Sequence, residues 1–275
     1  MFEKAFRGST RYWLLLGFWV LVMLGGLWAY SLQWTEGLTI TGMSRDVTWG
    51  LYIAQFTFLV GVAASAVMVV LPYYLHHTKA FGPMVILGEF LAVSAVLMCM
   101  LFIFVDLGQP RRMMNMILHP SPHSVMFWDM IVLTGYLLLN LVIGGMTLEA
   151  ERTGVPPPGW IKPLIYLSIP WAVSIHTVTA FLYSGLSARP FWMTPILAPR
   201  FLASAFASGP SLLILLALVL RKFTRFDAGK EAIQKLATIV TYALIVNLFF
   251  VLMEFFTVLY GDIPHHLHQI GRAHV

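Results

Sequence analysis

Six ionisable side chains lie within or at the ends of the long apolar runs of this chain. They are Glu89, Asp106, Asp129, His176, Arg200 and Glu254. An ionisable group at membrane depth is costly, so each of the six is a candidate for function. The structural alternative applies to those near helix ends, where an Asp–Arg pair can simply join two helices.

His176 lies deep in its apolar run, and two polar neighbours share its spacing. Thr179 follows His176 by three positions and Tyr183 follows Thr179 by four, which places all three on one helical face. That face can hold the polar head group of a ligand, or it can be a hydrogen-bonded packing seam. Glu254 and Asp129 are the candidates for proton exchange, and Glu89 is the candidate for a proton path.

The stretch from Asp106 to Asp129 is the most polar segment between two apolar runs. It contains two acids, two arginines, two histidines and three prolines. Loops held by a rigid scaffold often carry function. Arg111 therefore joins the candidate residues, and we expect it to lie at the same end of the helices as Asp106, Asp129 and Arg200.

The composition indicates a membrane protein. Of 275 residues, 59% are hydrophobic and only 11% are charged, against about a quarter charged in soluble domains. The single cysteine, Cys99, excludes a disulfide framework, a cysteine zinc site and an iron–sulfur cluster held by this chain alone. We predict no metal site. The net charge of +5 is no sign of nucleic-acid binding, because the basic residues lie between apolar runs.

Seven apolar runs are long enough to cross a bilayer, which needs roughly 20 residues. None alternates with the period of two typical of a membrane barrel, so we predict an all-α polytopic helix bundle without a separate soluble domain. The predicted helices are about Tyr12–Trp34, Val47–Leu75, Met84–Val105, Ser124–Met146, Trp160–Tyr183, Ala198–Leu220 and Ile233–Tyr260.

The positive charges predict the orientation. Eleven of the 17 lysines and arginines fall on the side of the N-terminus and five on the other side, which favours a cytoplasmic N-terminus in a bacterial or archaeal cell membrane. In this orientation Asp106, Asp129, His176, Arg200 and Glu254 gather towards the outer face. Glu89 alone lies on the cytoplasmic side.

Among possible ligands, a haem fits this pattern poorly. A b-type haem needs two axial ligands at matched depth, and His176 is the only histidine well inside a predicted span. Nucleotide-binding motifs and the nucleophile elbow are also absent from the sequence. The residues instead favour a site for a lipophilic quinone, whose carbonyls need hydrogen-bond donors and whose redox chemistry needs proton carriers.

Four stretches carry a resemblance to a known family. They are 106–111 (DLGQPR), 124–129 (SVMFWD), 44–56 (SRDVTWGLYIAQF) and 198–206 (APRFLASAF). They resemble the NrfD-type family, the membrane subunits of polysulfide reductase and its relatives, and more closely DsrP, the quinone-interacting subunit of the dissimilatory sulfite reductase-linked complex. The resemblance extends to about Gln269.

This resemblance implies a quinone site near the outer face of a bundle of eight to ten spanning helices, with no cofactor bonded to the chain. The substrate would be menaquinol or menaquinone. The implied partners are an extracytoplasmic ferredoxin-like iron–sulfur protein, a haem-b membrane subunit, a multihaem cytochrome c and a cytoplasmic iron–sulfur subunit. The implied role is to link the quinone pool to sulfur metabolism.

The last residues do not fit the family pattern. Residues 270–275 end a heptapeptide, QIGRAHV, that matches the translation of a common sequencing adapter. We therefore expect the NrfD-type domain to cover residues 1–269 and to be incomplete at its C-terminal end.

Two functions remain open at this point. In the first, the chain is the quinol oxidoreductase subunit of a respiratory complex. The outer rim is shaped by Asp106, Arg111, Asp129 and Arg200. His176 binds a quinone carbonyl together with Tyr183, and Glu254 or Asp129 exchanges the protons. In the second, the chain is a membrane anchor that docks redox subunits and binds no quinone. Quinone binding distinguishes the two.

Overall fold

The computed structural model describes residues 8–44, 47–74, 78–186, 189–262, 264 and 266–267. Within these ranges the chain is helical and contains no strand, which confirms the predicted all-α fold. The α-helices are α2 (Thr10–Glu36), α3 (Leu51–Ala63), α4 (Ser65–Tyr74), α5 (Gly82–Asp106), α6 (Asn115–Leu118), α7 (Val125–Thr153), α8 (Ile161–Ser184), α9 (Leu197–Phe223) and α10 (Lys230–Tyr260). Short 3₁₀ turns are η1 (Leu38–Thr41), η2 (Lys79–Phe81), η3 (Pro110–Arg112) and η4 (Pro190–Trp192).

Seven spans in the described part of the chain are long and apolar enough to cross a membrane, which confirms the predicted set. A helix satisfies its own backbone hydrogen bonds, as the hydrocarbon core requires. The ends are set by local chemistry. For example, α7 continues past the predicted Met146 and stops at Gly154, whose positive φ of 70° allows its N–H to bond back to the Ala150 carbonyl.

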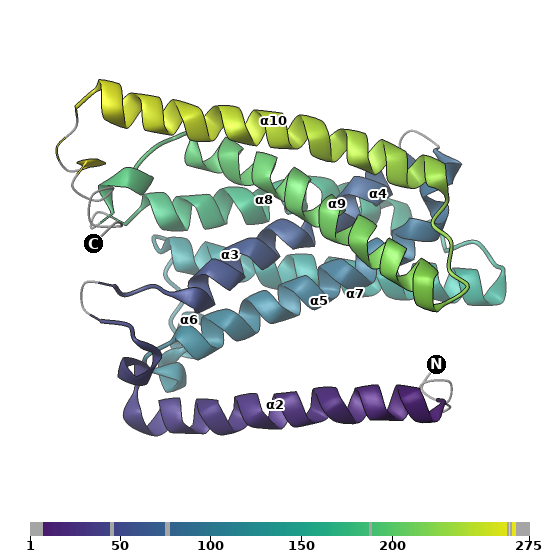
Figure 1. Ribbon diagram of the computed structural model, residues 1–275, viewed down its shortest axis with the longest axis horizontal. Helices are drawn as coiled ribbons and strands as arrows, with labels where there is room; N and C mark the ends of the chain where they lie inside the picture. The colour runs from purple at the N-terminus through teal and green to yellow at the C-terminus, as the bar shows by residue number, and fades with distance from the viewer. Residues whose placement is uncertain are drawn as a thin grey trace.

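The long helices run nearly side by side, as Figure 1 shows. Helices α3, α4, α5, α7, α8 and α9 pack into one bundle, and α10 lies along α9. Helices α3, α7 and α9 begin at the left end of the view, where α2, α5, α8 and α10 finish. We call this end the pocket face and the other end the opposite face.

The predicted second span is divided in the structure. It is one span by length, but α3 ends at Ala63 and α4 begins at Ser65. At this break the Ala64 N–H bonds to the Gly61 carbonyl, three residues back, and a second helix crosses very closely. A Cβ on Gly209 of α9 would lie 2.9 Å from the Ser65 nitrogen, so only glycine permits this approach.

Helix α2 stands apart from the bundle along most of its length (Figure 1). Its only buried residue is Gln33, near the pocket face. The Gln33 side-chain amide donates to the Val105 carbonyl at 2.5 Å and accepts from the Tyr52 hydroxyl at 2.9 Å. These two hydrogen bonds tie the end of α2 to α5 and α3.

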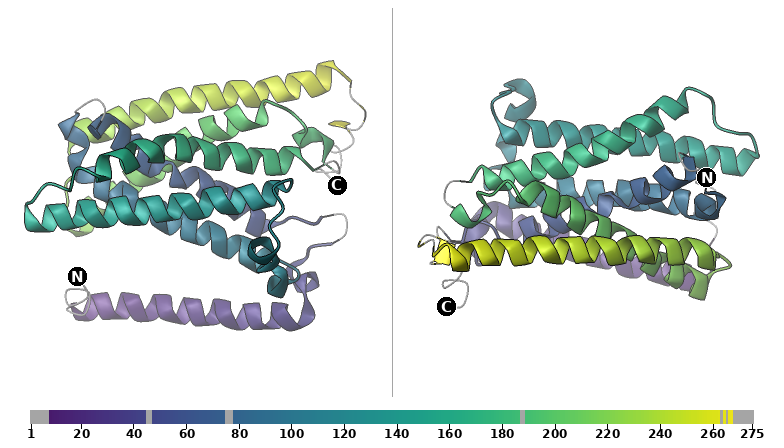
Figure 2. Two further views of the ribbon diagram at one scale, coloured as in Figure 1. Left: turned by 180° about the vertical axis from the view of Figure 1, so that it is seen from behind. Right: turned by 90° about the horizontal axis from the view of Figure 1, so that it is seen from above.

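The polar stretch between Asp106 and Asp129 is a short ordered segment containing η3 and α6. Figure 2 shows α6 at the side of the bundle near the pocket face, close to the end of α2 in the left view. Residues 268–275 lie outside the described part of the chain. The expectation for 270–275 therefore stays a prediction.

Candidate functional site

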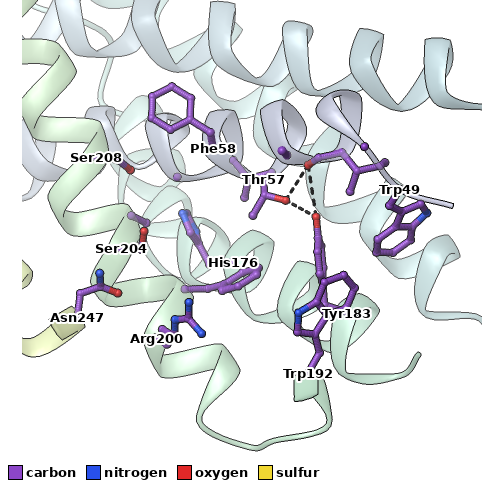
Figure 3. A pocket seen from close by; sticks show the side chains of 17 residues that line it. Trp49, Thr57, Phe58, His176, Tyr183, Trp192, Arg200, Ser204, Ser208 and Asn247 are labelled. Carbon is purple, nitrogen blue, oxygen red and sulfur yellow. Dashed lines mark hydrogen bonds between the residues drawn. The ribbon is translucent and has the colours of Figure 1, made fainter. Parts of the chain in front are cut away.

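A pocket of about 520 Å³ opens between α3, α8, α9 and α10 near the pocket face (Figure 3). Its walls are mostly apolar, and each of the four helices contributes between one and three polar side chains, the pattern expected of a small-molecule site. The polar side chains that line it are Thr57, His176, Tyr183, Arg200, Ser204, Ser208 and Asn247. Three residues predicted from the sequence, His176, Tyr183 and Arg200, are thus brought together.

His176 is 2% exposed, and its two ring nitrogens differ in their surroundings. Nδ1 lies 2.6 Å from the Ala172 carbonyl oxygen one turn earlier in α8. Since a carbonyl only accepts, Nδ1 carries a proton and donates. Nε2 is buried and makes no hydrogen bond, although the Val60 carbonyl lies beside it. In the neutral ring Nε2 is therefore a buried acceptor without a donor, on a residue that lines the pocket.

Tyr183 is placed differently, because its hydroxyl already has partners. It shares a short hydrogen bond with Thr57 Oγ1 and lies 3.4 Å from the Ile53 carbonyl oxygen, as the dashed lines of Figure 3 show. Thr57 Oγ1 in turn donates to the same carbonyl at 2.9 Å. The hydroxyl of Tyr183 is thus fixed against α3, and its ring forms part of the wall.

Aromatic rings close the pocket towards the loops. Trp49 and Trp192 stack with centroids 5.9 Å apart and an interplanar angle of 23°. The Tyr183 ring lies 5.1 Å from Trp49, 5.2 Å from Trp192 and 5.5 Å from Phe201. Trp49, just before α3, and Trp192, in η4, thus form the aromatic end of the pocket.

Arg200 and Glu254 form an ion pair between α9 and α10. The Arg200 side chain is 30% exposed and the Glu254 side chain 6%, so the carboxylate depends on this partner. Oε2 of Glu254 accepts from Arg200, whereas Oε1 is buried without a partner. Asn247 is two turns before Glu254 on α10, lines the pocket and has a buried, unpaired Oδ1.

Asp129 lies outside the pocket lining but close behind it. Its Oδ1 accepts a hydrogen bond of 2.7 Å from Thr179, which is one turn from both His176 and Tyr183 on α8. Asp129 is 3% exposed. The shared face of His176, Thr179 and Tyr183 thus serves two purposes: its ends line the pocket, and its middle binds a buried acid.

The remaining three predicted residues are not in the pocket. Asp106 ends α5, and its Oδ1 is buried without a hydrogen-bond partner. The Arg111 guanidinium lies over the ring of Trp34 on α2, 5.9 Å from its centroid. Both are at the pocket face, as predicted, but they neighbour the end of α2 and do not form a rim around His176.

Glu89 lies towards the opposite face, at the interface of α5 and α7. It is 2% exposed, and its Oε2 has no partner. A Cβ on Gly144 would come within 3.2 Å of the Glu89 Cβ, so this glycine lets the helices meet at the acid. Nearby on α7, Tyr136 donates to the Ala63 carbonyl at the break after α3, and Asn140 donates to the Tyr136 carbonyl.

Several lining residues were missed in the sequence, although one signal marked them. Arg200, Ser204 and Ser208 recur every four residues on α9, and Thr57 and Gly61 do so on α3. Such spacing puts small or polar groups on one helix face. It does not say which helices those faces meet. As for metals, no group of three His, Cys, Asp or Glu side chains converges within the described ranges.

Comparison with known protein families identifies the family of this chain. The model of the family "Polysulphide reductase, NrfD" matches residues 39–269. The chain belongs to the NrfD family. The match covers every pocket helix and both segments around the helix break, and it confirms the family resemblance seen in the sequence. The chain is therefore an NrfD-type polytopic membrane protein.

Curated relatives support the same assignment. The chain is 28% identical over 253 residues to a putative membrane subunit of dimethyl sulfoxide reductase from Halobacterium salinarum, covering 85% of this chain and 57% of that protein. It is 24% identical to a subunit of selenate reductase from Mesobacillus selenatarsenatis, covering 89% and 65%. It is 23% identical to the "Hdr-like menaquinol oxidoreductase integral membrane subunit" of Archaeoglobus fulgidus, covering 92% and 62%.

This NrfD-type chain thus spans about three fifths of the length of these relatives. Their names describe subunits of reductases and oxidoreductases with different substrates. None of the three names is that of a DsrP, so the closer likeness to DsrP stays a prediction.

Proposed function

We propose that this NrfD-type chain is the quinol-binding membrane subunit of a respiratory oxidoreductase complex and that the head group of menaquinol binds in the pocket beside His176. The observation that carries the proposal is the unpaired, buried Nε2 of His176 at the wall of a pocket of about 520 Å³. A buried polar atom without a partner is costly, and a ligand hydroxyl would satisfy it. The name of the Archaeoglobus fulgidus relative supports menaquinol as the substrate.

The tautomer of His176 favours the reduced form of the substrate. Nδ1 donates to Ala172, so Nε2 accepts, and it can take a hydrogen bond from a quinol hydroxyl. Oxidation of a quinol to a quinone releases two electrons and two protons. Nε2 can accept one proton as a general base, and the Ala172 carbonyl that accepts from Nδ1 holds the ring in the orientation this requires. Donation from His176 to a quinone carbonyl requires that the ring first be protonated.

Other groups complete the proposed site. Arg200, held by Glu254, and Asn247 supply polar contacts on the opposite wall. Tyr183 contributes its ring to the pocket wall, because its hydroxyl is already hydrogen-bonded to Thr57. We assign proton exchange with the pocket-face surface to Asp129, which accepts from Thr179 on the same face of α8 as His176, and to Glu254, which pairs with Arg200. Asp106 and Arg111 belong to the adjacent surface near α2.

The orientation of the chain in the membrane decides which partners could reach the pocket face. With the N-terminus in the cytoplasm, the pocket face is extracytoplasmic, and a ferredoxin-like iron–sulfur subunit docking there would take or supply the electrons. The closer resemblance to DsrP suggests a haem-b membrane subunit, a multihaem cytochrome c and a cytoplasmic iron–sulfur subunit as further partners, and a link to sulfur metabolism. Menaquinol is a substrate in this proposal, and the chain itself binds no haem or iron–sulfur cluster.

The decisive test is the substitution His176→Ala in membranes that contain the complete complex. Loss of one hydrogen bond to a buried ligand group costs about 1–3 kcal/mol, so the Kd of a menaquinol analogue should rise roughly 5- to 150-fold. The rate of analogue oxidation should fall with it. Binding is measured by titration under anaerobic conditions, and oxidation by absorbance.

Two matched variants control this experiment. Thr177→Ala removes the next side chain of α8, which is half-buried and bonds to the Val173 carbonyl. Glu89→Gln alters a buried acid, and neither residue lines the pocket. Both should bind the analogue within about twofold of the wild type. Glu89→Gln should instead reduce proton uptake from the opposite face if Glu89 serves a proton path.

If His176→Ala binds normally in an assembled complex, the site is elsewhere. If Arg200→Gln is silent too, the anchor function replaces the quinol site.

A further inference from the structure

A second pocket lies at the opposite face, far from His176 along the helices. It has a volume of about 320 Å³ and lies between the end of α4, η2 and the first turns of α8. Its lining consists of three tyrosines, two lysines and one isoleucine: Tyr73, Tyr74, Tyr166, Lys79, Lys162 and Ile165. Neither the proposed quinol site nor the anchor function involves these residues.

The pocket is positively charged. Lys79 and Lys162 come from different elements, η2 and α8, and none of the lining residues is acidic. Neither lysine takes part in an ion pair found among the described residues. The acid of α5 at this end of the bundle is Glu89, which is 2% exposed and does not line the pocket. The two ammonium groups are therefore available to an anion.

The walls are suited to a phosphate ester. Tyr73 and Tyr74 meet edge to face with centroids 4.8 Å apart. Tyrosine presents an apolar ring and a polar hydroxyl, which suits the boundary between head groups and hydrocarbon. Ile165 is 1% exposed and forms an apolar floor. Polar donors at the mouth and an apolar base match the boundary between a head group and its acyl chains.

An apolar surface leads from the pocket towards the centre of the membrane. On α8, Tyr166, Pro170 and Val173 follow one another at intervals of four and three residues, which places them on one face. Tyr166 is 47% exposed and Val173 is 42% exposed. A soluble anion would gain nothing from this surface, whereas an acyl chain attached to the phosphate would lie along it.

We propose that this pocket binds an anionic phospholipid, with its phosphate between Lys79 and Lys162 and an acyl chain along α8. Basic pockets at the ends of membrane helices recognise such head groups. The site is independent of the proposed quinol site and would hold whichever function the other pocket has. The bound lipid would anchor this end of α4 and α8 at the membrane surface.

The test uses the purified chain in detergent after removal of bound lipid. Fluorescent phosphatidylglycerol is titrated against the wild type and against the double variant Lys79→Gln/Lys162→Gln. If each lysine contributes about 1 kcal/mol, as a basic residue near an anionic surface does, the double variant should bind roughly 30-fold more weakly. Arg221→Gln/Lys222→Gln makes the same charge change at the exposed end of α9 on this face and should bind within about twofold.

Further arms separate the possible outcomes. Lys79→Arg/Lys162→Arg keeps the charge and should retain binding, which also covers the case in which the glutamine variant misfolds. Phosphatidylcholine, glycerophosphoglycerol without acyl chains, and inorganic phosphate should each compete poorly with the labelled lipid. Equal competition by inorganic phosphate would show a soluble-anion site and overturn the lipid assignment. An equal loss of lipid binding in the α9 control variant would show only a general effect of charge. That result would overturn the lipid assignment as well.

Discussion

The pocket beside His176 and the polar face of α7 both bury polar groups at membrane depth, but they satisfy them differently. We define the polar face of α7 as Asp129, Tyr136 and Asn140, on the side that meets α3, α5 and α8. All three are hydrogen-bonded within the protein, to Thr179 or to backbone carbonyls. In the pocket, the lining residues His176 and Asn247 each keep one buried polar atom, Nε2 and Oδ1, without a hydrogen-bond partner.

The difference separates groups that hold the helices together from groups that await a ligand. A paired group in a packed interface contributes to stability, and its removal has little effect on a distant ligand. An unpaired group beside a cavity costs free energy until something binds. Glu89 is intermediate, since its Oε2 is unpaired but packed near Gly144 with no pocket around it. That environment suits a group that passes a proton better than one that binds a ligand.

The strongest test on the pocket side is the substitution Arg200→Gln. It leaves Glu254, whose side chain is only 6% exposed, without its counter-charge. Breaking such a pair costs about 2–3 kcal/mol here, because Arg200 itself is partly exposed. The reverse change, Glu254→Gln, removes the buried charge and should cost only about 1 kcal/mol. Unfolding in detergent, followed by intrinsic fluorescence, measures the loss of stability in both variants. Equal losses would contradict the conclusion that the buried Glu254 carboxylate needs Arg200 as its counter-charge.

The close contact between α9 and the break after α3 is tested by Gly209→Ala. The added Cβ would lie 2.9 Å from the Ser65 nitrogen and 3.1 Å from the Gly61 carbonyl oxygen, both backbone atoms that cannot easily move. Overpacking of this kind costs about 1–3 kcal/mol. Gly145→Ala is the control, since nothing lies within 4 Å of its added Cβ, and it should change stability by less than about 0.5 kcal/mol. A neutral Gly209→Ala would mean that α9 can move away from α4.

The smallest effect is expected on the polar face of α7, from Tyr136→Phe. This change deletes the hydrogen bond of 3.2 Å to the Ala63 carbonyl and leaves the ring in place. Interhelical hydrogen bonds in membranes contribute about 0.6 kcal/mol on average, so stability should fall by that amount. Menaquinol binding should stay within about twofold of the wild type. Tyr242→Phe, on the exposed side of α10, is the control, and a large loss of binding in Tyr136→Phe would move the ligand site towards α7.

Much of the fold was predictable because hydrophobicity alone marks the spans. The predicted ends of Trp160–Tyr183 and Ile233–Tyr260 lie within three residues of α8 and α10. The break at Ala64 was not predictable, since it depends on how closely Gly209 of another helix approaches. The site was predicted in part. His176, Tyr183 and Arg200 meet in one pocket, whereas Asp106 and Arg111 lie near α2.

The sequence by itself determined the number of spans, the depth of each polar residue and the shared face of His176, Thr179 and Tyr183, because these follow from composition and from the helical repeat. Only the tertiary structure decided which groups became partners. Arg200 pairs with Glu254 and Asp129 bonds to Thr179, although several acids at the same depth were equally plausible for Arg200. Which groups pair depends on which helices are neighbours and on how each helix is rotated about its axis. A helix with apolar residues on both its lipid-facing and protein-facing sides does not encode its neighbours or its rotation in its hydrophobic periodicity.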